Sequence, residues 1–168
     1  TAARTQLEAE DPSGYVDSLK LKYRDLKRQV SDAADALSAA SDAVQVMPTM
    51  LGADGPKNYL LVVQNNAELR STGGLPGAVS VINANDGKLK LTRQVAGNSL
   101  AVADIPVLEL SNAESIAYGG IVGTIFLDAN LQPDWGRASD FMREHWKQNF
   151  GQDVDGVLSI DRSRSRTS

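Results

Sequence analysis

The stretch Asn58-Tyr59-Leu60-Leu61-Val62-Val63 decides the fold, because five aliphatic or aromatic residues follow one another without polar alternation. Such a run is typical of a β-strand that is buried on both faces of its sheet. Both faces of a sheet are covered when helices pack on it, so the stretch predicts an α/β domain with a strand over residues 58–63.

A β-hairpin is expected directly downstream of this strand. Residues 78–83 are rich in β-forming side chains, and Asn85-Asp86-Gly87-Lys88 provides the Asp-Gly pair that a type I′ turn requires. The return strand over residues 88–92 alternates leucine with lysine, which predicts one solvated face. The hairpin therefore contributes an antiparallel pair to the sheet.

The rest of the domain alternates helix and strand signals. Ser111 and Glu114 have the spacing of a capping box, which predicts a short helix to about Tyr118. An amphipathic pattern over residues 136–150 predicts a helix, and residues 154–161 a last strand. We therefore expect one α/β domain over residues 52–161, with a mixed sheet of about four or five strands and packed helices.

A long heptad-patterned segment precedes this domain. Apolar residues recur in steps of four and three along residues 12–47, at Leu19, Tyr23, Leu26, Val30, Ala33, Leu37, Ala40, Val44 and Met47. This is the period of a coiled-coil seam, and Pro48 is expected to stop the helix. Two interpretations stay open: a helix or helix pair packed on its own domain, or a stalk that brings two copies together. Residues 1–11 and the tail over residues 162–168 are expected to be disordered.

Composition excludes several classes of function. The 168 residues carry a net charge of −4 and a pI of about 5.0, so we expect no nucleic-acid partner. The chain has no cysteine, which excludes a thiolate metal site and a cysteine nucleophile, and its single histidine, His145, is expected at a surface or interface. No apolar run reaches the roughly 18–20 residues that span a bilayer.

A dense polar segment follows the first strand and is the main candidate site. The stretch QNNAELRSTGG, residues 64–74, reads as a loop at the end of a strand, where ligands of α/β sheets often bind. Its arginine offers a planar fork of donors that suits phosphate or carboxylate. The candidate ligand-binding residues are Gln64, Asn65, Asn66, Glu68, Arg70 and Thr72. The alternative is that Glu68 and Arg70 hold the loop together.

Two acids in a second polar segment are candidate metal ligands. Asp128 and Asp134, with Asn130 between them, offer the oxygen atoms that Mg²⁺ or Ca²⁺ prefers. The alternative for Asp134 is that it caps the helix that follows. No other cofactor is expected.

The segments YLLVVQNNAELRSTGGLPG (59–77), LDANLQPDWGRASDF (127–141) and VDGVLSID (154–161) together resemble a family of extracytoplasmic proteins of Gram-positive cell envelopes that has no assigned function. The resemblance implies a membrane anchor in the full-length protein and a helical spacer at residues 12–47. It also implies that the α/β domain is truncated on its C-terminal side.

A looser likeness is to the LytR-CpsA-Psr phosphotransferases, which transfer glycopolymers from polyprenyl pyrophosphate carriers. This likeness implies a pyrophosphate-binding arginine at Arg70, but Ser71-Thr72-Gly73 lacks the metal-binding acid of that family. Three hypotheses follow: a module of cell-envelope glycopolymer assembly that binds an anionic, phosphate-bearing carrier or polymer; a magnesium-dependent phosphotransferase; and a structural module that forms a homo-oligomer through residues 12–47.

Overall fold

A computed structural model of the chain describes residues 2–10 and 12–161. The tail over residues 162–168, expected to be disordered, lies outside the described residues. The chain forms two compact units, which divide between Pro48 and Thr49.

The first unit is helical. It contains α1 (Ala2–Ala9), the short 3-10 helix η1 (Pro12–Gly14) and the long helix α2 (Asp17–Met50). Helix α1 replaces the disordered end that we expected, and it packs on α2: the Tyr23 hydroxyl donates a hydrogen bond to the carbonyl of Leu7. Contact with a neighbouring helix stabilises a short helix that has little stability alone, and the local sequence does not carry this information.

The expected stop at Pro48 is wrong by two residues. Pro48 lies inside the last turn of α2, which ends at Met50. A proline this close to the end removes one backbone hydrogen bond and leaves few residues for its ring to disturb. The chain then turns at Gly52, which has a φ of +82°.

The second unit contains a four-stranded mixed sheet, which confirms the predicted α/β class. Its strands are β1 (Lys57–Arg70), β2 (Gly73–Asn85), β3 (Lys88–Ala96) and β4 (Gly156–Asp161), in the order β3-β2-β1-β4. The β1–β2 and β2–β3 pairs are antiparallel, whereas β4 is parallel to β1. The predicted turn between β2 and β3 is confirmed: Asp86 and Gly87 have φ values of +48° and +74°, as a type I′ turn requires.

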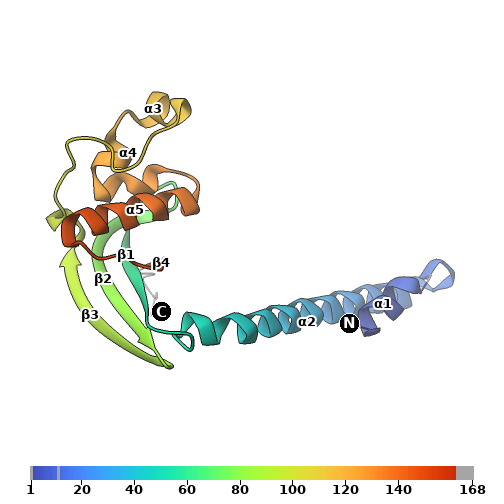
Figure 1. Cartoon of the computed structure of the whole chain (residues 1–168). Helices are drawn as coiled ribbons and strands as arrows, with labels where there is room; N and C mark the ends of the chain where they lie inside the picture. Colours follow the sequence, from blue (N-terminus) through green and yellow to red (C-terminus); the bar gives the residue numbers. More distant parts are fainter. Residues whose placement is uncertain (1, 11, 162–168) are drawn as a thin grey trace, which may run out of the picture. The chain divides into compact units, whose positions relative to one another are not determined.

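Helices cover one face of this sheet (Figure 1). Nearest the sheet are the helix α5 (Trp135–Phe150) and the 3-10 helices η2 (Gly97–Ser99) and η3 (Phe126–Leu131), whereas α3 (Asn112–Tyr118) and α4 (Ile121–Thr124) lie farther from the strands. The Ser111–Glu114 capping box of α3 is present as predicted.

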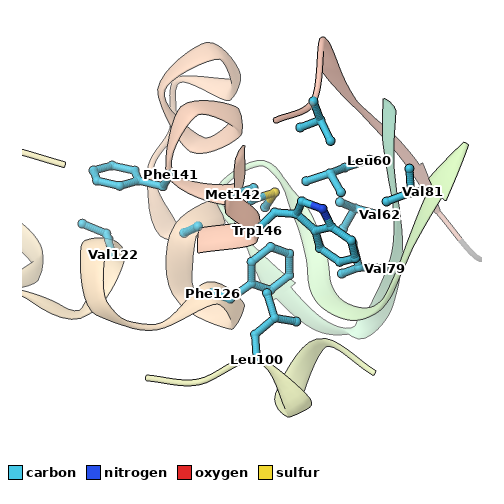
Figure 2. Close-up of a cluster of buried hydrophobic side chains, with 12 residues drawn as sticks. Leu60, Val62, Val79, Val81, Leu100, Val122, Phe126, Phe141, Met142 and Trp146 are labelled. Carbon is cyan, nitrogen blue, oxygen red and sulfur yellow. The ribbon is translucent and has the colours of Figure 1, made fainter. Parts of the chain in front are cut away.

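The core lies between the sheet and α5 (Figure 2). Leu60 and Val62 of β1 and Val79 and Val81 of β2 are fully buried there, opposite Trp146. Alternate residues of each strand point to this face, so the remaining apolar side chains of β1 point to the other face.

That other face of the sheet is apolar and uncovered by the helices of the second unit. The register of the strands assigns seven apolar side chains to this face: Leu61, Val63, Ile82, Leu89, Leu91, Leu158 and Ile160. The alternation in the return strand predicted that only its lysine face is solvated. Leu89 and Leu91 are 62% and 54% exposed, so its leucine face is solvated as well. The uninterrupted apolar pattern of residues 59–63 thus reflects one packed face and one open apolar face.

Candidate functional site

The polar segment 64–74 is not a loop beyond the first strand, as the sequence suggested. Strand β1 continues through Val63 to Arg70, and a two-residue turn at Ser71-Thr72 leads directly into β2. The register shifts between Val63 and Gln64 and again between Asn65 and Leu69. The bulges interrupt the alternation of side chains, and an exposed hairpin end has no buried face that requires apolar residues. The apolar pattern by which a strand is recognised is therefore missing here. We call residues 64–74 the hairpin tip.

Gln64 organises the hairpin tip from inside. Its side chain is 2% exposed, its amide nitrogen donates to the carbonyl of Thr72 at 3.2 Å, and its amide oxygen accepts from the backbone N–H of Gly74 at 3.2 Å. An ideal Cβ at Gly73 would lie 1.9 Å from that amide oxygen, and one at Gly74 would lie 2.3 Å from the carbonyl oxygen of Asn65. The two glycines are therefore required by close packing at this point.

One ion pair and three hydrogen bonds join the hairpin tip to the second polar segment. The Arg70 guanidinium forms an ion pair with Asp128, with 3.2 Å between Nη2 and Oδ1. The backbone N–H and the hydroxyl of Thr72 both donate to the carbonyl of Asn130, and the Asn130 side chain donates to the carbonyl of Gly74 at 2.7 Å. The sequence motifs 64–74 and 128–134 thus form one structure, with helix η3 seated against the tip.

Arg70 is held by Asp128 of the second polar segment, and among the described residues no hydrogen bond joins it to Asn65, Asn66 or Thr72. Asn65 instead accepts a hydrogen bond from the backbone N–H of Ala67 at 3.2 Å. Among the described residues Glu68 has no side-chain partner, and it is exposed together with Asn65 and Asn66.

Two buried polar atoms at this junction have no hydrogen-bond partner within the described chain: Nε of Arg70 and Oδ1 of Asn130. The Arg70 and Asp128 side chains keep 23% and 19% of their surface exposed. An arginine that is paired with one carboxylate and has a further donor unused retains hydrogen-bonding capacity for a planar or tetrahedral anion.

The two candidate metal ligands have different roles in the fold. Asp128 pairs with Arg70, whereas Asp134 caps α5 by accepting a hydrogen bond from the backbone N–H of Arg137 at 3.1 Å. Across residues 2–10 and 12–161, no group of three or more His, Asp or Glu side chains is arranged to hold a metal ion.

Sequence analysis missed a second polar cluster, centred on Glu114 and Arg137. Nε and Nη2 of Arg137 donate to the two Glu114 carboxylate oxygens at 2.8 and 3.2 Å, and Gln132 donates to one of them at 2.7 Å. The hydrogen bond from Arg137 lowers the pKa of Glu114 to about 2. The cluster borders an open depression of about 630 Å³ on the surface. Glu114 was recognised only as a capping residue, because nothing in the local sequence indicates an arginine from α5.

The expectation that His145 lies at a surface or interface is wrong. Its side chain is 1% exposed, and its ring meets Phe126 edge to face. Burial lowers its pKa to about 4. The position lies on the apolar side of α5, beside Met142 and Trp146, which amphipathicity alone would have indicated.

A known protein family matches the part of the chain that contains the hairpin tip. The model of the family DUF4012, described as a protein of unknown function, matches residues 54–164, which include β1 to β4 and both polar segments. No curated protein and no solved structure matches the chain. Because the match covers more than half of the sequence, the chain belongs to the DUF4012 family.

Proposed function

We propose that the hairpin tip binds an anionic, phosphate-bearing carrier or polymer, and that the protein acts as a binding module in cell-envelope glycopolymer assembly. The observation that carries the proposal is the ion pair between Nη2 of Arg70 and Oδ1 of Asp128, beside which Nε of Arg70 has no hydrogen-bond partner within the described chain. A phosphate that replaced this carboxylate would accept two parallel hydrogen bonds from the same guanidinium.

Asp128 acts in this proposal as an internal substitute for the ligand. It holds the guanidinium in place without a ligand, and a doubly charged phosphate competes with it for the same donors. Elsewhere on the hairpin tip, the exposed amides of Asn65 and Asn66 offer further donors. The tip does not need to be ordered when the ligand binds, because Gln64, Thr72 and Asn130 already fix its backbone.

The extracytoplasmic setting of this proposal rests on the resemblance of residues 59–77, 127–141 and 154–161 to proteins of Gram-positive cell envelopes. Among the described residues, no helix is both long and apolar enough to cross a membrane. A membrane anchor is part of the proposal and rests on the same resemblance.

Titration of the purified chain with geranyl pyrophosphate and with inorganic pyrophosphate, followed by calorimetry, tests the proposal. Arg70→Ala should abolish binding, and Asp128→Asn should tighten it, because the substitution removes the competing charge and keeps the shape. Arg28→Ala is the matched control, since Arg28 also pairs with an aspartate, Asp25, at 3.0 Å but lies on α2.

Each outcome is decisive for the proposed site. Binding that survives Arg70→Ala, or that weakens with Asp128→Asn, would place the anion elsewhere. The absence of binding to either pyrophosphate at millimolar concentration would overturn the proposal. Equal affinity for the two compounds would assign recognition to the phosphates alone, whereas tighter binding of the geranyl compound would indicate a contribution of the lipid.

A magnesium-dependent phosphotransferase is the second candidate, and one observation favours it. The Arg70–Asp128 separation of 3.2 Å is short enough for both side chains to reach one pyrophosphate-metal group, which spans only a few ångströms. Repeating the titration with Mg²⁺ distinguishes the candidates. A phosphotransferase site should bind pyrophosphate more tightly with Mg²⁺ and lose this gain in Asp128→Asn, whereas a simple anion site should bind it less tightly, because Mg²⁺ masks the ligand charge.

A further inference from the structure

Helix α2 carries an exposed apolar stripe along the heptad positions. Leu37, Val44 and Met47 are 65%, 70% and 55% exposed, and Leu19 and Leu26 are about half exposed, at 46% and 49%. Monomeric proteins rarely expose a continuous apolar surface of this kind unless it binds a partner. The strict alternation of steps of four and three further indicates that the partner is a helix.

Helix α1 partly covers the seam at Tyr23 and Val30, which are half-buried, and leaves the other seam positions exposed. It contacts α2 near Tyr23 through the carbonyl of Leu7, and Ala34, one position beyond the seam residue Ala33, is buried. Leu7 also lines a cavity with Val30 and Ser31. The seam positions Leu19, Leu26 and Leu37 stay accessible beside α1, so a second helix has room along the same stripe.

We propose that α2 pairs antiparallel with α2 of a second copy of this chain. The steps assign Tyr23, Val30, Leu37 and Val44 to the a positions of the heptad, and Leu19, Leu26, Ala33, Ala40 and Met47 to the d positions. In an antiparallel pair each a residue faces a d residue of the partner. The register that places Leu26 opposite the partner's Leu37 also pairs Leu19 with Val44, Tyr23 with Ala40 and Val30 with Ala33, and it leaves Met47 outside the paired seam.

Side-chain size favours this orientation. In the antiparallel register the large Tyr23 faces the partner's Ala40, and Val30 faces the partner's Ala33, so large and small residues alternate across the seam. A parallel pair in register would instead place Ala33 against the partner's Ala33 and Ala40 against the partner's Ala40. Both of those layers would be thinly packed, while two tyrosines would be forced against each other at Tyr23.

Charge favours the same orientation. Residues 17–28 contain five basic and two acidic side chains, whereas residues 29–50 contain three acidic and no basic ones. An antiparallel pair places each basic half beside an acidic half, and Lys22 at a g position faces the partner's Ala43. A parallel pair would instead bring Lys22 close to the partner's Lys27 at an e position, which is repulsive on both sides of the seam.

Sedimentation velocity of the full 168-residue chain between about 1 and 300 μM tests self-association. Val44→Glu should weaken the dimer by about tenfold or more, because it places two charges in the interface. Val46→Glu is the matched control: Val46 is 52% exposed on the same helix but lies outside the seam, so it should leave the dimer unchanged. Circular dichroism of both variants checks that α2 remains helical.

Cross-linking tests the orientation, because the chain has no cysteine of its own. Oxidation of an equimolar mixture of Leu19→Cys and Val44→Cys, with one copy tagged, should give the mixed disulfide dimer, and neither variant alone should cross-link efficiently. Efficient homodimers of each single variant would overturn the antiparallel assignment. A monomer at all concentrations, or equal weakening by Val44→Glu and Val46→Glu, would overturn the pairing itself. Neither result bears on the hairpin tip, whose anion binding is measured separately.

Discussion

Nη2 of Arg70 lies 3.2 Å from Oδ1 of Asp128, and this ion pair joins the end of β1 to helix η3. The two residues belong to polar segments that are far apart in the sequence and that share no local pattern. Their contact makes the hairpin tip and η3 a single structural unit. Any ligand that binds Arg70 therefore changes the environment of η3 as well.

We predict that Arg70 and Asp128 are energetically coupled. Arg70→Ala leaves Asp128 largely buried without its counter-charge, and we expect it to destabilise the protein by about 1–3 kcal/mol. The double variant with Asp128→Ala should recover about 1–2 kcal/mol of the summed single effects. Urea unfolding of the four proteins measures this coupling, and strictly additive effects would show that the ion pair contributes nothing.

We predict that Gly74→Ala destabilises the fold, whereas Gly77→Ala in the same strand does not. A Cβ at Gly74 would lie 2.3 Å from the backbone of Asn65, but one at Gly77 has no atom nearer than 3.8 Å. The first change should cost about 1–3 kcal/mol through overpacking, and the second should be neutral or stabilise by up to about 1 kcal/mol. Thermal melts of the two variants provide the comparison, and equal melting temperatures would contradict the close packing.

We predict an acid-sensitive contribution from His145. Burial lowers its pKa from 6.5 to about 4, so the folded protein favours the neutral ring and the unfolded chain binds the proton more readily. The stability that this residue contributes is complete above about pH 6.5 and is lost as the pH falls toward 4. Because the chain has one histidine, its ring proton resonances can be followed by NMR without assignment. A midpoint near 6.5 would show that the ring is solvated.

We predict a second, lower pH window for Glu114. Its pKa falls from about 4.5 to about 2, chiefly through the hydrogen bond from Arg137. A lowered carboxyl pKa stabilises the fold above about pH 4.5, and this stabilisation is lost as the pH falls toward 2. Stability measured from pH 5 to 2 should decline less steeply in Glu114→Gln than in the unmodified protein. His145→Gln is the control, since it should flatten the curve between pH 6.5 and 4 and leave the lower window unchanged.

Local signals were sufficient for most of the secondary structure. The Asp86-Gly87 turn, the Ser111–Glu114 capping box and the helix over residues 136–150 were all predicted, because each depends on residues a few positions apart. The extent of β1 was not, since its polar half lies at an exposed hairpin tip where strand residues have no apolar face.

The candidate site was predicted in composition but not in geometry. Arg70 and Asp128 were each selected for their chemistry, yet their pairing depends on how η3 packs against the hairpin, which no local pattern encodes. The same holds for Arg137 and Glu114, which come together only when α5 packs beside α3. Long-range ion pairs are determined by tertiary packing, so a single sequence identifies the members but not the pairs.

The parallel pairing of β4 with β1 has a consequence for the order of folding. Strands β1, β2 and β3 follow one another through two-residue turns, so their pairing closes only short loops. Strand β4 joins β1 across nearly a hundred residues, as the hydrogen bond between Asn58 and Asp155 records with a separation of 97 positions. Closing so long a loop is entropically costly and slow. We therefore expect the three-stranded meander to form first and β1 to remain an open edge, able to pair with another chain, until β4 joins it.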